Sequence, residues 1–356
     1  MSIISSFLNN IDYLMPFKKK IGYLGWIGFG NLGDEALFEA NKRIFREQKV
    51  LPYKHTHKIE IYEKTFKRSI YDAVCLGGGT LINSSHINKF KEAQDIGYPT
   101  FVFGSGVRNP IFWNHVEGWE DSIGEWISLL NKCRFIGVRG PLSEEILRRN
   151  GCQNVEIIGD PVLHLAESNV KYKEKNKKIC INIGISLGNI WGSEDEVLEF
   201  IIKLAKILLS SGWDVSFLPV WNEDLKYIEE AVKKIGIGAD EIFKDYLSTT
   251  KTLEYLKSFD ILIGEKLHSV ILAMCVYTPS IMLEYRPKCL DFMKSMDLEK
   301  FNVRTDMLSI DLIMDLINEL YVHPDAIQDH IFKKISQYKN IQKEKSRMIF
   351  EDKSYF

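Results

Sequence analysis

The chain of 356 residues lacks an excess of charge of either sign, because 46 Lys and Arg stand against 48 Asp and Glu, for a formal net charge of -2. Nucleic-acid-binding proteins carry a basic surface that holds phosphates, so this balance gives no reason to expect a nucleic-acid partner. The sequence also lacks apolar runs of the ~20 residues that a membrane-spanning helix needs. It contains no internal repeat and no low-complexity tract. The remaining composition is ordinary for a soluble globular enzyme.

Cysteine is scarce, with six residues, and none of them stands in a C-x-x-C pair. Four lie in apolar stretches, where a thiol acts as a small hydrophobic group: Cys75, Cys133, Cys180 and Cys275. Close pairs of cysteines are typical of metal sites and redox motifs. We therefore predict reduced cysteines, a cytoplasmic protein and no metal site.

The first twenty residues, MSIISSFLNNIDYLMPFKKK, lack the order of a secretory signal, because the basic cluster follows the apolar part. The apolar residues of segment 1–20 share one face of a helix, with three lysines beside it. Such an amphipathic segment either packs on the body of the protein or gives a weak foothold on an anionic membrane surface. The second alternative predicts peripheral contact with the inner face of the membrane.

Short apolar runs alternate with helical patterns along almost the whole chain, which is typical of parallel sheets covered by helices on both faces. In the first half we expect strands at residues 20–26, 58–62, 73–78, 100–106, 134–140 and 155–160. In the second half we expect strands at residues 179–185, 213–220, 260–265 and 279–285.

The domain organisation follows from length and from a linker. A chain of 356 residues is long for one core, and residues 168–178 are polar, rich in lysine and without apolar periodicity. We predict an α/β protein of two doubly wound, Rossmann-like domains at residues 21–168 and 176–305, with a helical tail at 306–356 that packs back on the first domain. Ligands of such folds bind where the carboxyl ends of strands face a cleft, so the site is expected between the domains.

The first glycine loop, GWIGFGNLGDEAL, contains the G-x-G-x-x-G pattern of dinucleotide-binding proteins at Gly28, Gly30 and Gly33. Asp34 would place a negative charge beside the pyrophosphate, and no suitable ribose-binding acid follows the next strand, which disfavours a nicotinamide dehydrogenase. Asn31 is able to adopt left-handed conformations. Asp34 is expected either to cap the following helix or to contact a substrate hydroxyl.

A second glycine loop, CLGGGTLIN, ends the strand at residues 73–78. Gly78 and Gly79 either let a ligand approach the main chain or relieve crowding in a tight turn. Thr80 is expected to cap the next segment. A third loop of this kind, FGSGVRN, follows the strand at residues 100–106, and three glycine-lined strand ends favour a ligand pocket in the first domain.

The second domain carries a cationic stretch, EKLHS, directly after the strand at residues 260–265. Lys266 and His268 precede a helix that is expected to start near Ser269. Free N–H groups at a helix start, a lysine and an imidazole form a suitable site for a phosphate. A histidine alone is usually structural, but these neighbours favour a catalytic role for His268.

Arg139 stands at the equivalent strand end of the first domain, in GVRGPLSEE. It is expected either to complete an anion clamp across the cleft or to form a surface ion pair with Glu144 or Glu145.

Five segments occur in a characteristic order: GNLGDEAL, LGGGTLI, GVRGPLSEEIL, IIGDPVLHL and KLHSVILAMCVYTPSIMLEYRPKCLDF. On these motifs, roughly residues 20–300 resemble the polysaccharide pyruvyl transferase family. The resemblance implies a two-domain architecture similar to the GT-B glycosyltransferases. It also implies transfer of the enolpyruvyl unit of phosphoenolpyruvate to a sugar, usually as a cyclic ketal across two hydroxyls, with no metal or redox cofactor.

The resemblance also implies residue roles. His268 would protonate the methylene carbon of phosphoenolpyruvate, and Asp34 would orient or deprotonate an acceptor hydroxyl. The donor would be held by Lys266, Arg139, Leu267 and the helix start at Ser269. The acceptor, a sugar of a polysaccharide or of its lipid-linked precursor, would be bound by Asn31, Gly33, Gly78, Gly79 and Thr80.

Two alternatives to this function remain open. A sugar-nucleotide glycosyltransferase of the GT-B type would also place a histidine near its donor pocket, and Glu284 would then bind a ribose. A sugar-binding or scaffolding protein without activity is supported by Lys266, because the family usually has arginine there and lysine lacks its two-pronged grip on phosphate or carboxylate. Glu265, close to the anion site, is expected to tune His268.

Overall fold

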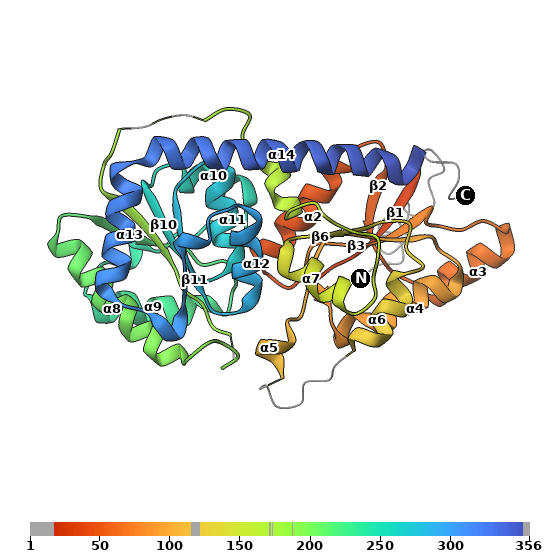
Figure 1. The fold of residues 1–356 in the computed structure, drawn as a ribbon, viewed down its shortest axis with the longest axis horizontal. Helices are drawn as coiled ribbons and strands as arrows, with labels where there is room; N and C mark the ends of the chain where they lie inside the picture. The colour runs from red at the N-terminus through yellow and green to blue at the C-terminus, as the bar shows by residue number, and fades with distance from the viewer. Residues whose placement is uncertain (1–17, 115–121, 171, 173, 187, 352–356) are drawn as a thin grey trace, which may run out of the picture.

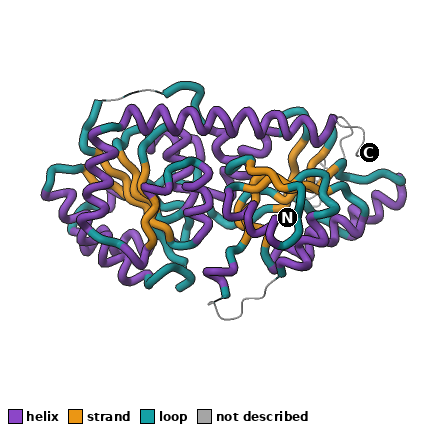
Figure 2. Tube along the Cα trace, viewed as in Figure 1, coloured by secondary structure: helices purple, strands orange, loops and turns teal. Residues whose placement is uncertain are grey.

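The structure is a computed structural model, and it describes residues 18–114, 122–170, 172, 174–186 and 188–351. Two lobes, each built on a parallel sheet, lie side by side along the long axis (Figures 1 and 2). Residues 1–17 of the segment expected to be amphipathic lie outside the described residues. In the part of the chain that the structure describes, no helix is long and apolar enough to cross a membrane.

The first lobe contains a seven-stranded parallel sheet in the order β2-β1-β3-β5-β6-β7, with β4 paired to β5. Its strands are β1 (Lys20–Leu24), β2 (Lys49–Pro52), β3 (Ala73–Leu76), β4 (Gly79–Ile82), β5 (Thr100–Val107), β6 (Ile136–Val138) and β7 (Val155–Ile157). Its helices are α2 (Leu32–Ile44), α3 (His57–Phe66), α4 (Ser84–Ile96), α5 (Pro110–Trp113), α6 (Ile123–Leu130), α7 (Pro141–Arg149) and η1 (Pro161–Leu165). The central strands β1, β3 and β5 are buried throughout, as expected for a sheet covered on both faces.

The second lobe contains a five-stranded parallel sheet in the order β12-β11-β10-β8-β9. Its strands are β8 (Lys178–Asn182), β9 (Asp214–Phe217), β10 (Ile261–Gly264), β11 (Ser280–Glu284) and β12 (Asn302–Arg304). Its helices are α8 (Glu194–Ser210), α9 (Asp224–Ile235), η2 (Ala239–Glu241), α10 (Thr249–Leu256), α11 (Leu267–Cys275), α12 (Pro287–Ser295), η3 (Glu299–Phe301) and η4 (Thr305–Met307). Buried apolar side chains between sheet and helices form the core of each lobe. The predicted α/β class with two parallel sheets is confirmed.

Two helices end the described chain, α13 (Ile310–Val322) and the long α14 (Pro324–Glu351). Figure 1 shows α14 running along both lobes. The Tyr338 hydroxyl donates to the carbonyl of Ser295 in the second lobe, whereas Gln342 Nε2 donates to the carbonyls of Ile158 and Asp160 in the first. The helical tail therefore fastens the two lobes together.

One predicted strand is wrong, because residues 58–62 lie in helix α3. The Thr56 hydroxyl caps this helix by accepting from the Ile59 backbone N–H at 3.4 Å. No residue of α3 is fully buried: Ile61 is 50% exposed, and Ile59 packs only in part against the core of the first lobe. The place beside β1 is instead taken by Lys49–Pro52, whose register pairs Lys49 with Lys20.

Candidate active site

The two lobes meet where the first turn of α2 lies against the first turn of α11. A Cβ added to Gly33 would lie 2.1 Å from Nδ1 of His268, and one added to Gly30 would lie 2.4 Å from Nδ2 of Asn222. The Leu32 backbone N–H donates to the carbonyl of Val220 in the second lobe, at 2.8 Å. Gly30 and Gly33 are therefore required for close contact between the lobes. This explains why the G-x-G-x-x-G pattern occurs in a chain that is not expected to bind a dinucleotide. Gly33, predicted to line the acceptor site, gives the imidazole its space.

His268 faces a buried carboxylate of the first lobe. Its Nε2 lies 3.9 Å from Oδ2 of Asp160, and neither atom has a hydrogen-bond partner among the described residues. Burial lowers the pKa of His268 to about 3, and the charges of Lys288 and Arg139 act in the same direction. Burial raises the pKa of Asp160 to about 6 against the opposing effect of Arg139. Near pH 7 the imidazole is therefore neutral. Asp160, from the IIGDP motif, received no role in the sequence analysis.

Arg139 is a buried cation that is short of partners. Its side chain is 1% exposed, and none of its three guanidinium nitrogens makes a hydrogen bond within the described residues. Its Nη2 lies 3.6 Å from Oδ2 of Asp291 on α12, which is itself engaged by the Ser143 hydroxyl. The alternative of a surface ion pair with Glu144 or Glu145 is wrong, because the side chain is buried between the lobes.

Lys288, in the first turn of α12, is a further cation of this site that the sequence analysis missed. Burial lowers its pKa to about 7, and repulsion by Arg286 adds to the effect. Its Nζ lies 4.9 Å from the centre of the Tyr285 ring. Lys288 follows a strand of the second sheet much as Lys266 does, and that equivalence was the available signal.

Lys266 turns its charge into its own lobe. Its Nζ donates to the carbonyl of Ile185 at 2.5 Å and to the Ser186 hydroxyl at 2.9 Å, and lies 3.9 Å from Oδ1 of Asp224. Ile185 and Ser186 belong to the loop that follows β8, and Asp224 is the first residue of α9. That Lys266 binds phosphoenolpyruvate stays a prediction, and the ammonium group of Lys266 already contacts oxygen atoms of its own lobe.

Glu265 also faces its own lobe, where its Oε2 accepts from the Gly184 backbone N–H at 2.9 Å. Burial raises its pKa to about 7. The charged groups that shift the pKa of His268 are Lys288 and Arg139, so the contacts of Glu265 do not support the predicted tuning of that histidine.

The helix behind the imidazole begins at Leu267, two residues earlier than expected from Ser269. Its N-cap, Lys266, makes no side-chain cap hydrogen bond, so the first N–H groups of α11 have no side-chain cap. The Ser269 hydroxyl donates instead to the Lys266 carbonyl at 2.6 Å. Both Leu267 and Ser269 have buried side chains, and the Ser269 backbone N–H donates to the Lys266 carbonyl at 2.9 Å. The backbone N–H of Leu267 is therefore the part of this pair that is suited to an anion.

Asp34 lies in the first turn of α2, but Asn31 is the cap. The Asn31 Oδ1 accepts from the N–H groups of Gly33 and Asp34 at 2.9 and 3.3 Å. Burial raises the pKa of Asp34 to about 7, and Lys288 opposes this shift. The Asp34 carboxyl is thus free of capping and able to give or take a proton near neutral pH.

The second glycine loop adjoins Asp34. A Cβ on Gly78 would meet Leu37 at 2.2 Å, which is crowding, whereas one on Gly79 would lie 3.9 Å from Oδ1 of Asp34. Gly79 has a φ of +104°, a value that suits glycine. Thr80 lies in β4, and the Asn83 side chain caps α4, so the predicted cap at Thr80 is wrong. The Thr80 hydroxyl is buried and has no partner among the described residues.

Glu284, the ribose-binding residue of the glycosyltransferase alternative, is 3% exposed. Its carboxylate accepts from Asn302 Nδ2 at 2.6 Å and from Trp191 Nε1 at 3.3 Å. These contacts leave it poorly placed to bind a ribose.

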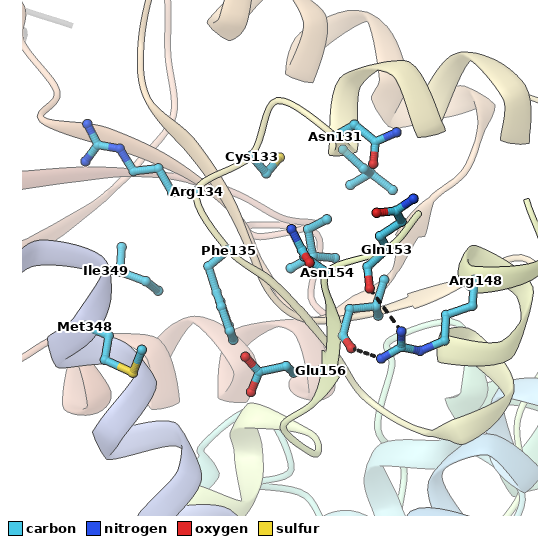
Figure 3. A pocket seen from close by; sticks show the side chains of 13 residues that line it. Asn131, Cys133, Arg134, Phe135, Arg148, Gln153, Asn154, Glu156, Met348 and Ile349 are labelled. Atoms are coloured by element: carbon cyan, nitrogen blue, oxygen red, sulfur yellow. Dashed lines mark hydrogen bonds between the residues drawn. The ribbon is translucent and has the colours of Figure 1, made fainter. Parts of the chain in front are cut away.

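A separate hollow of about 540 Å³ lies at the start of β6 and β7, beside α14 (Figure 3). It is lined in part by Arg134, Phe135, Glu156, Met348 and Ile349. None of the residues placed at the lobe interface lines it, so it is distinct from the candidate active site.

Comparisons with known proteins agree with this architecture. The putative UDP-N-acetylglucosamine 2-epimerase of Listeria monocytogenes is 10% identical, with a TM-score of 0.61 over 94% of this chain and 97% of that one. MnaA of S. aureus, solved with UDP, is 15% identical, with a TM-score of 0.57 over 92% and 94%. A glycosyltransferase of Rickettsia africae is 10% identical, with a TM-score of 0.56 over 95% and 100%. At these identities the likeness shows the fold alone, which is GT-B-like.

No curated protein sequence matches the chain. The sequence model of the polysaccharide pyruvyl transferases matches residues 31–287, well over half of it. That range includes the residues assigned above to the reaction or to its substrates, except Lys288, which lies one position beyond its end. Membership implies phosphoenolpyruvate as the donor and a polysaccharide sugar as the acceptor. The chain is therefore a transferase of the polysaccharide pyruvyl transferase family.

Proposed function

We propose that this enzyme moves the pyruvyl unit of phosphoenolpyruvate onto two hydroxyls of a sugar, at the contact between α2 and α11. The observation that carries the proposal is the cluster of His268, Arg139 and Lys288. In it, a guanidinium without hydrogen-bond partners among the described residues and a lysine repelled by neighbouring cations both act on a buried imidazole. Phosphoenolpyruvate carries a phosphate and a carboxylate close together. A small polyanion therefore matches positive charges that otherwise repel each other.

The donor is held mainly by Arg139 and Lys288. Arg139 has unused guanidinium N–H groups in a buried setting, which suits a two-pronged contact with a carboxylate or phosphate. The start of α11, from Leu267 to Ser269, adds the backbone N–H of Leu267 and the positive end of a helix, while the Ser269 N–H donates to the Lys266 carbonyl. Lys266, which also repels Lys288, adds positive charge from behind this site.

The proton that phosphoenolpyruvate receives comes from His268, and the binding of phosphoenolpyruvate promotes protonation of the imidazole. The imidazole is neutral near pH 7 because of burial and two neighbouring cations. A bound trianion offsets those cations and raises the pKa of His268. Asp160, 3.9 Å from Nε2, then stabilises the imidazolium. The protonated ring delivers its proton to the methylene carbon, and the adjacent carbon becomes electrophilic.

The acceptor reacts on the side of Asp34. This carboxylate takes the proton of one hydroxyl, whose oxygen attacks the electrophilic carbon. Phosphate leaves with the oxygen that joined it to carbon, and a second hydroxyl closes the ketal. In total, two carbon–oxygen bonds form and one carbon–oxygen bond breaks. His268 gives its proton to the carbon that becomes the methyl group, and one of the two sugar hydroxyl protons restores it. The other hydroxyl proton leaves on the phosphate. The acceptor pocket comprises Asn31, Gly33, Gly78, Gly79 and Thr80.

The physiological acceptor in this proposal is a lipid-linked precursor of the polysaccharide. The enzyme acts in the cytoplasm, and the segment 1–20 brings it to the inner face of the membrane. The support is the order of apolar and basic residues in that segment.

The test is release of inorganic phosphate from phosphoenolpyruvate in the presence of nitrophenyl hexosides or lipid-linked sugars. We expect release that requires the sugar and that His268→Ala abolishes. The matched control is His57→Ala, whose side chain is 83% exposed on α3 and remote from the site. Thermal protection by UDP-sugars, with none by phosphoenolpyruvate, would favour a glycosyltransferase instead.

A further inference from the structure

Two aromatic side chains are exposed on the loop between β1 and α2, residues 25–31. Trp26 is 46% exposed and Phe29 is 58% exposed. Their ring centres lie 4.5 Å apart with an interplanar angle of 31°, so the two rings form one apolar surface. An exposed apolar patch with polar groups around it is typical of a binding site.

We propose that Trp26 and Phe29 form a stacking platform for a sugar ring of the acceptor next to the ring that receives pyruvate. This inference rests on the proposed function and names its substrate class: an acceptor of at least two sugar units. The C–H face of a pyranose packs on an aromatic ring, while its hydroxyls remain free for polar groups at the edge.

The position of the platform supports this role. Phe29 precedes Asp34 by five residues, which span at most about 18 Å of extended chain. A short oligosaccharide bridges such a distance. A sugar on the platform thus belongs to the same chain as the sugar whose hydroxyl meets Asp34.

The platform is also held rigidly. The Gly28 backbone N–H donates to Oε1 of Glu35 at 2.6 Å, and Trp221 Nε1 donates to the carbonyl of Phe29 at 3.3 Å. Asn31 forms an isolated antiparallel bridge with Trp221 of the second lobe. Because the loop is fixed before the ligand arrives, little conformational entropy is lost on binding.

The charges nearby favour a sugar over an anionic membrane. Asp34 and Glu35 stand in the first turn of α2, directly after the loop. Acids at this position repel anionic lipid headgroups, which are attracted by clusters of lysine and arginine. Carboxylates are, in contrast, good acceptors for sugar hydroxyls.

The test uses the full chain with the double variant Trp26→Ala, Phe29→Ala. We expect KM for a disaccharide or longer acceptor to rise about tenfold, as the loss of an aromatic stack suggests. KM for phosphoenolpyruvate and for a monosaccharide acceptor should stay within a factor of two. The matched control is Tyr62→Ala, Phe66→Ala, which removes an aromatic pair with 4.8 Å between ring centres on α3.

An unchanged KM for the longer acceptor, or an equal rise for the monosaccharide, would overturn the platform. So would loss of binding to phosphatidylglycerol vesicles with no change for soluble acceptors, because the pair would then contact membrane. If the unaltered enzyme releases no phosphate from phosphoenolpyruvate, the proposed function fails. In that case, calorimetric binding of methyl disaccharides to the unaltered enzyme and to the double variant still tests the platform. About tenfold weaker binding by the variant supports the platform, and equal binding contradicts it.

Discussion

The neighbouring strands β10 and β11 of the second sheet end at the same edge, and each is followed by a lysine at the start of a helix. Lys266 occupies the N-cap position of α11, and its ammonium contacts a carbonyl, a hydroxyl and the carboxylate of Asp224. Lys288 lies in the first turn of α12, and its ammonium contacts an aromatic ring among other cations. Similar sequence positions thus lead to opposite electrostatic settings.

This difference predicts that one lysine contributes mainly to stability and the other mainly to function. A buried charge with hydrogen-bonding partners holds its surroundings together, and its loss leaves those partners unsatisfied. A partly buried charge among like charges costs stability, and it is retained where a ligand of opposite sign completes the site. We therefore expect Lys266 variants to change stability first and Lys288 variants to change catalysis first.

The largest expected effect is that of Lys288→Met. We expect kcat/KM for phosphoenolpyruvate to fall about 10²- to 10³-fold, the usual loss when a preorganised charge is removed. The melting temperature without substrate should stay equal or rise, because a strained cation is removed. If the Lys288→Met variant kept nearly full activity, or had a much lower melting temperature, Lys288 would not differ from Lys266 in the way proposed here.

Gly33→Ala tests whether His268, on the helix after β10, depends on the first lobe for its position. The added methyl would lie 2.1 Å from Nδ1, so the ring or the lobes must shift. We expect about a 10²-fold loss in kcat with correct folding by circular dichroism. Gly124→Ala, with nothing within 4 Å of the added atom, is the control and should keep full activity.

Lys266→Met is expected to act mainly on stability. Loss of the ammonium leaves the buried Asp224 without its cation, and burial already raises the pKa of Asp224 to about 6. We expect the free energy of unfolding to fall by on the order of 3 kcal/mol, measured by urea denaturation. KM for phosphoenolpyruvate should change far less than in Lys288→Met. The reverse order of the two effects would make Lys266 the donor ligand.

The smallest effect is a shift of the pH profile in Lys288→Arg. The pKa of Lys288 is lowered to about 7, so its positive charge is present below that pH and is lost as the pH rises above it. We expect kcat/KM for phosphoenolpyruvate to fall above pH 7 in the natural enzyme. Arginine keeps its charge, so the fall should move at least one unit higher. Titration of the substrate is common to both proteins and cancels from the comparison; identical profiles would exclude Lys288 as the titrating group.

Much of the fold was predictable because its signals are local. Alternating apolar runs and helical patterns place most strands, and the error at residues 58–62 arose where a capped, exposed helix carries isoleucines two residues apart. The site was predictable only in part. His268, Asp34 and Arg139 stand out because each follows a strand end in a motif, whereas Lys288 and Asp160 acquire their meaning from neighbours on other segments.

The sequence by itself determined the two parallel sheets, the glycines that allow close approach and the family, because these depend on local periodicity and on motif order. Only the tertiary structure decided which lysine has oxygen partners and which remains among cations. It also decided that Gly33 makes room for an imidazole and that the pKa values of His268 and Asp34 move in opposite directions. The physical reason is that solvation and charge depend on what other segments bring within a few ångströms.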